Sequence, residues 1–68
     1  MKVKEFMNCV EGFHAFYLKN ETNGEILHFV TTEEEGKIIW CKKRYGDYDV
    51  YSWYVNNNIV HINIDMPD

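Results

Sequence analysis

The chain has 68 residues, is 46% hydrophobic and 16% aromatic, and carries a formal net charge of −4. This length predicts a single domain over residues 1–68, and the apolar content with only one proline excludes a disordered acidic segment. The chain has no run of about twenty apolar residues and no apolar signal-peptide core, so we expect no membrane span and a cytoplasmic location.

The acidic surplus is confined to the C-terminal third. Residues 1–44 contain equal numbers of acidic and basic groups, whereas the rest contains only the acids Asp47, Asp49, Asp65 and Asp68. An acidic field opposes binding to nucleic-acid phosphates and favours a basic protein surface as partner. The surplus can equally serve solubility alone.

The first predicted element is a short helix. Val3, Phe6, Met7 and Val10 are spaced as one apolar face of a helix, and Gly12 is a suitable end.

From Phe13 onward, β-branched and aromatic residues occur in short segments separated by turn residues. These segments predict five strands at about 13–19, 25–32, 37–44, 48–55 and 59–65. The predicted fold class is therefore α+β, with a short N-terminal helix packed on a five-stranded antiparallel β-meander. The alternative is an all-β small barrel.

Pairing these strands in register aligns one aromatic from each of four strands into a stripe: Phe16, Phe29, Trp40 and Trp53. The opposite face is then the core, and it contains Ala15, Tyr17, Ile26, Val30, Ile39, Cys41, Val50, Tyr54, Val60, Ile62 and Ile64. Leu18 would pair with Leu27, and Trp53 with His61. A sheet with two apolar faces needs a second cover, which could be closure into a barrel, a second copy or another partner.

No constellation of residues indicates catalysis, a metal or a cofactor. The three histidines, His14, His28 and His61, fall on separate predicted strands. Cys9 and Cys41 form neither a disulfide framework nor a zinc motif. The Asp47 and Asp49 pair is more typical of a solvated turn than of acid–base chemistry. We therefore predict that the protein is not an enzyme and uses no cofactor.

The sequence favours a non-enzymatic protein-interaction module, such as a small acidic inhibitor or adaptor of a larger, basic protein. The Asn-, Ile- and Lys-rich composition is typical of a low-GC bacterium or its phage. A homodimer is a further expectation, and nucleic acid is disfavoured. The predicted partner-binding residues are Phe29, Trp40, Tyr51, Trp53, Asp47, Asp49 and Asp65. The alternative is a domain that binds a nucleotide or single-stranded nucleic acid on an aromatic sheet face with Lys42 and Arg44.

Overall fold

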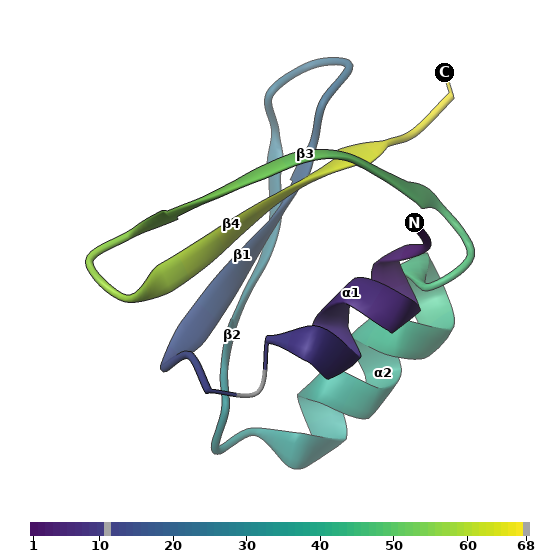
Figure 1. Cartoon of the computed structure of the whole chain (residues 1–68). Helices are drawn as coiled ribbons and strands as arrows, with labels where there is room; N and C mark the ends of the chain where they lie inside the picture. Colours follow the sequence, from purple (N-terminus) through teal and green to yellow (C-terminus); the bar gives the residue numbers. More distant parts are fainter. Residues whose placement is uncertain (11, 68) are drawn as a thin grey trace.

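The computed structural model describes residues 1–10 and 12–67. Its elements in chain order are α1 (Val3–Cys9), β1 (Ala15–Asn20), β2 (Ile26–Thr31), α2 (Glu35–Tyr45), β3 (Asp49–Asn56) and β4 (Ile59–Asp65). The strands form one mixed sheet in the order β2-β1-β4-β3, in which β1 and β4 are parallel central neighbours and each has an antiparallel hairpin partner at the edge. Both helices lie on the same face of this sheet (Figure 1). We call the other face, on which no helix of the described residues lies, the helix-free face.

The predicted N-terminal helix is confirmed as α1. Its apolar positions Val3, Phe6 and Met7 are buried, as is Val10 directly after its end. The helix begins with a local cap, because the Glu5 carboxylate accepts a hydrogen bond from the Lys2 backbone N–H at 3.2 Å.

The predicted strand at 37–44 is wrong, because these residues belong to α2. Ile38, Cys41 and Tyr45 are spaced as one helical face, and this face packs against the core with Cys41 completely buried. Acidic Glu35 in the first turn and the basic residues of the last turn also suit the helix dipole. The β-branched and aromatic residues from Ile38 onward indicated a strand, but burial of one helical face outweighs that weak local preference.

The helix changes the topology of the sheet. The chain leaves β2 at one edge, crosses the core side as α2 and enters β3 at the other edge, so the sheet is four-stranded, mixed and open. The five-stranded antiparallel meander is therefore wrong, and so is the small barrel, although the fold is still α+β. The predicted pairings through Trp40 do not exist. Trp53 pairs with Ile62 rather than His61, and Leu18 pairs with His28 rather than Leu27.

The core fills the space between the helices and the sheet. On the sheet it contains Phe16, Leu18, Val30, Val60, Ile62 and Ile64. The predicted core face is correct for β4 but wrong for Tyr17 and Tyr54, because a register error of one residue moves every side chain of a strand to the other face. Ile26 and Ile39, also predicted for the core, are exposed.

Neither α1 nor α2 is long and apolar enough to cross a membrane, and this finding covers residues 1–10 and 12–67.

Candidate functional site

Four rings, one from each strand, form a continuous row on the helix-free face. In spatial order they are Phe29 on β2, Tyr17 on β1, His61 on β4 and Tyr54 on β3. Strand register places them side by side, since Tyr17 pairs with both Phe29 and His61, and His61 pairs with Tyr54. Successive ring centroids are 4.7, 5.0 and 4.4 Å apart. We call these four side chains the aromatic row.

The rings of the aromatic row are close enough to support one another. Tyr54 and His61 are stacked with an interplanar angle of 5°, and Tyr17 stacks on the other side of His61 at 20°. At the two ends the rings face solvent, because Phe29 is 38% exposed and Tyr54 is 47% exposed. The row is therefore both pre-organised by its neighbours and accessible at its ends, as a binding surface requires.

A polar strip lies beside the aromatic row, one step further along the strands. The Lys19 ammonium donates a hydrogen bond to the Tyr54 hydroxyl at 3.1 Å and lies 5.3 Å from the centroid of the same ring. Lys19 is the register partner of Asn63, whose amide donates to the Ser52 hydroxyl at 2.9 Å. The face thus offers stacking rings next to an ammonium, an amide and a hydroxyl.

His61 is held as a neutral ring within the row. Desolvation, and secondly the positive charge of Lys19, lower the pKa of His61 below its ordinary value of 6.5. Its Nδ1 atom is buried and has no hydrogen-bond partner among the described residues. A neutral imidazole preserves the apolar character of the row at physiological pH.

The predicted acidic residues are placed differently from one another. Asp47 pairs with Lys4 at 3.0 Å, and Asp49 pairs with Lys2 at 3.3 Å, so α1 and its preceding residue supply counter-charges to the turn before β3 and to the first residue of β3. Asp65 is exposed at the end of β4 and is the register partner of Asp49. The fold therefore offsets part of the C-terminal acidic surplus, and the fourth acid, Asp68, lies outside the described residues.

The predicted aromatic stripe is not one surface. Phe16 is a core residue, and Phe29 belongs to the aromatic row. Trp40 lies on α2, where its ring packs edge-on against His28 at 5.0 Å. Trp53 stands on the helix side of β3, with its ring 5.2 Å from that of Phe6. Tyr51 lies at the irregularity in the β3–β4 register and is 64% exposed.

Sequence reasoning missed Tyr17, His61 and Tyr54 as site residues. The alternation of Phe16 and Leu18 with Tyr17 and Lys19 is a signal that Tyr17 faces away from the core. Nothing comparable could have placed His61 beside Tyr17, because their contact depends on the parallel pairing of β1 with β4.

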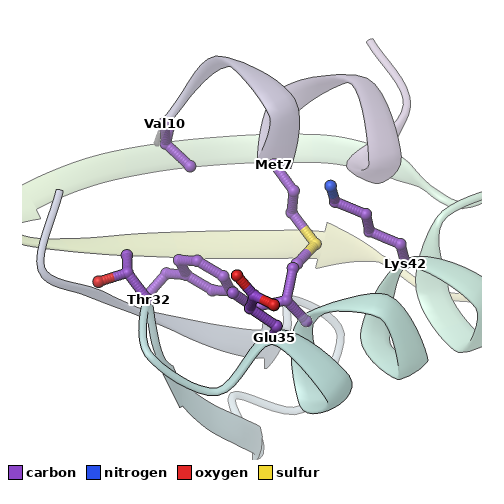
Figure 2. A pocket seen from close by; sticks show the side chains of 7 residues that line it. Met7, Val10, Thr32, Glu35 and Lys42 are labelled. Atoms are coloured by element: carbon purple, nitrogen blue, oxygen red, sulfur yellow. The ribbon is translucent and has the colours of Figure 1, made fainter. Parts of the chain in front are cut away.

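A second candidate site is a pocket of about 270 Å³ between the helices (Figure 2). Its lining residues are Met7, Val10, Phe16, Thr32, Glu35, Ile38 and Lys42. The Lys42 ammonium is already bound to the Asn8 side-chain carbonyl at 2.6 Å. The volume is slightly below the roughly 300 Å³ at which small-molecule sites begin, so this pocket ranks behind the helix-free face.

The remaining reactive side chains are dispersed. Among residues 1–10 and 12–67, no group of three His, Cys, Asp or Glu side chains is arranged to hold a metal ion. Both cysteines are free, with Cys9 exposed and Cys41 buried. Burial raises the pKa of the Cys41 thiol, which keeps it protonated and a poor nucleophile.

Comparison of the chain with protein families, with curated proteins and with solved structures gave no match. What the helix-free face can do is set by its own chemistry. Its rings, with an ammonium, an amide and a hydroxyl beside them, can bind other molecules through stacking and hydrogen bonds.

Proposed function

We propose that the protein is a non-enzymatic protein-interaction module and that it docks its partner on the helix-free face. The observation that carries this proposal is the aromatic row, a line of rings across all four strands with no helix of the described residues over it. Protein interfaces are enriched in tyrosine and other aromatics, because these side chains bury much area at a low cost in conformational entropy.

The charge of the chain supports a larger, basic protein as the partner. The net charge is −4, and Asp65 and Asp49 lie at one end of the helix-free face. Acids at the border of an interface accelerate encounter with a basic surface, while the buried rings supply most of the binding energy. An inhibitor or an adaptor would act in this way, since either needs only a specific surface.

Of the partner-binding residues predicted from the sequence, Phe29 belongs to the proposed surface, and Asp49 and Asp65 border it. Trp40 and Trp53 lie elsewhere on the molecule, so they provide an internal control. They are more exposed than the ends of the aromatic row, with exposed fractions of 48% and 55%.

The test is capture of a partner from a low-GC bacterial lysate, followed by affinity measurements with variants. Phe29→Ser and Tyr54→Ser should each weaken binding by about 30-fold, which corresponds to about 2 kcal/mol for an interfacial aromatic. The matched control Trp40→Ser should change the affinity by less than about threefold, equivalent to about 0.6 kcal/mol. The reverse order would place the docking surface on α2 and overturn the proposal.

One observation favours a second function, the binding of single-stranded nucleic acid. The Lys19 ammonium lies over the rings of both Tyr17 and Tyr54, as in surfaces that combine base stacking with a cation. The net charge of −4 argues against this function, because phosphate contacts supply most of such affinity. Titration of the intrinsic fluorescence with oligothymidylate at two salt concentrations decides it. Binding that weakens with salt and with Lys19→Met would favour nucleic acid.

A further inference from the structure

The two edges of the sheet are shielded unequally by the chain itself. Beside β2, the Lys37 ammonium donates a hydrogen bond to the Phe29 backbone carbonyl at 2.9 Å. Along β3, the Val50 N–H donates a hydrogen bond to the Met1 carbonyl at 2.9 Å, and the Lys2 backbone forms an isolated antiparallel β-bridge with Asp49. From Ser52 to the end of β3, no other segment of residues 1–10 and 12–67 pairs with the outer edge. We call residues 52–56 the free edge.

Hairpin geometry shows which backbone groups the free edge presents. The β3–β4 hairpin turns through Asn57 and Asn58, whose φ angles of 54° and 62° fit a two-residue type I′ turn. In such a hairpin the closing pair, here Asn56 and Ile59, is hydrogen-bonded, and the pairs behind it alternate. Val55 and Trp53 therefore direct their N–H and C=O groups outward, away from β4.

The free edge lacks the features by which proteins prevent edge pairing. It contains no charged residue and no proline, and the irregularity in the β3–β4 register lies before it, between Val50 and Ser52. Its side chains Trp53, Tyr54 and Val55 are 55%, 47% and 42% exposed. The hairpin also extends beyond both helices (Figure 1), which leaves room for another strand.

We propose that the free edge pairs antiparallel with the same segment of a second copy, about a two-fold axis at Tyr54, to form one eight-stranded sheet. In this register Tyr54 faces its own equivalent, and Trp53 faces the partner's Val55. The outward N–H and C=O groups of Trp53 and Val55 in one copy then lie opposite the acceptors and donors of the same residues in the second copy. In this register the paired segment is 52–56, which ends before Val50, whose N–H already donates to the Met1 carbonyl.

Side-chain chemistry selects a second copy as the occupant. Antiparallel pairing keeps paired side chains on one face, so Trp53 meets valine on the helix side and Tyr54 meets tyrosine on the helix-free face. The acidic chain does not repel itself at this seam, because the free edge is uncharged and Asp49 is paired with Lys2. The same pairing would extend the aromatic row through Tyr54 into the row of the second copy. This dimer forms through the backbone edge of β3 and shares only the Tyr54 side chain with the helix-free face, so loss of partner binding in Phe29→Ser and loss of the Tyr54→Cys cross-link report on the two proposals separately.

Disulfide trapping tests the proposed register without any partner protein. The background variant is Cys9→Ser, which removes the exposed native thiol and leaves the buried Cys41. In this background we expect Tyr54→Cys to form a covalent dimer on mild oxidation, because a non-hydrogen-bonded pair has Cα atoms about 4.5 Å apart, within the disulfide range.

The matched controls are Ser52→Cys and Asn56→Cys. Each alone should form at least tenfold less dimer, since two equivalent positions would lie roughly 14 Å apart along the strands. A mixture of the two should cross-link, because Ser52 faces the partner's Asn56. Equal cross-linking of all variants, or none with Tyr54→Cys, overturns the proposal.

Sedimentation equilibrium of the unmodified chain is the second test. An edge-to-edge contact of a few residues buries little area, so we expect a dimer dissociation constant of about 100 µM. Val55→Pro removes an outward N–H without removing a bond to β4, and it should weaken the dimer at least tenfold while the chain stays folded. A strict monomer at about 1 mM, or a chain that pairs only with an unrelated strand, overturns the proposal.

Discussion

Trp53 on β3 and Ile62 on β4 are direct register partners, so both side chains stand on the helix side of the sheet. Ile62 is completely buried, whereas Trp53 is 55% exposed and contacts the core through the ring of Phe6. The difference arises because β4 is a central strand above the helices and β3 is an edge strand. Two side chains on one face can therefore contribute very differently to stability.

The first prediction follows from this contrast. Ile62→Ala should lower the free energy of unfolding by about 2–5 kcal/mol, because it leaves a cavity in a closely packed core. Trp53→Ala should cost about 1 kcal/mol, since most of its ring is already in solvent. Urea unfolding of both variants measures the difference. Equal losses would mean that Trp53 is a core residue in solution.

The sequence predicted that Trp53 and Ile62 lie on opposite faces of the sheet, and that prediction is wrong. The burial of Ile62, Val60 and Ile64 was predictable, because their alternation with polar residues in β4 is regular. The face of β3 was not predictable, because its aromatics Tyr51, Trp53 and Tyr54 occur at both alternating positions and give no unique pattern. Period alone cannot then choose the face.

The helix α2 was the decisive omission in the sequence analysis. Residues from Ile38 onward have strand-like composition, and only contact with the core selects the helical face formed by Ile38, Cys41 and Tyr45. When this segment is predicted as a strand, it lies between β2 and β3 in an antiparallel meander. That arrangement contains no parallel pairing of β1 with β4. The aromatic row depends on that pairing, so the candidate site could not be assembled from the sequence.

Thiol reactivity should differ between the two cysteines. Cys9 is exposed, and we expect it to react with an aromatic disulfide reagent in the folded protein. Cys41 should react at least tenfold more slowly, because it is buried and desolvation raises the pKa of its thiol. The reaction followed at neutral pH, with and without denaturant, measures both. Rapid labelling of two thiols per folded chain would contradict the packing of α2.

Two glycine substitutions should act in opposite directions. At Gly46, a Cβ would collide with the Lys42 carbonyl and lie 2.9 Å from the Lys4 Cβ, where α1 passes the end of α2. Gly46→Ala should therefore destabilise the protein by about 1–3 kcal/mol. Gly36→Ala is the control, because a Cβ at this position would meet no atom within 4 Å. This substitution should stabilise α2 by about 0.5–1 kcal/mol. Thermal melts compare the two, and destabilisation by both would mean that the space around Gly36 is also filled.

The last prediction concerns the pH dependence caused by His61. Its pKa is lowered in the folded chain by desolvation and by Lys19, while in the unfolded chain it returns to the ordinary value of 6.5. Below 6.5 the unfolded state therefore binds more protons than the folded state, so the free energy of unfolding should fall as the pH decreases from 6.5 toward the lower folded value. Above 6.5 this contribution is constant.

His61→Phe is the matched variant, because it keeps a ring between Tyr17 and Tyr54 but cannot titrate. Urea unfolding at pH values on both sides of 6.5 should show a steeper loss for the unmodified chain than for this variant. Lys19→Met should reduce the same loss, since it removes the positive charge that acts against protonation of His61. An identical pH dependence in all three chains would mean that His61 does not lie in the desolvated row. The helix-free face would then lack the neutral, stacked surface on which partner binding is proposed to depend.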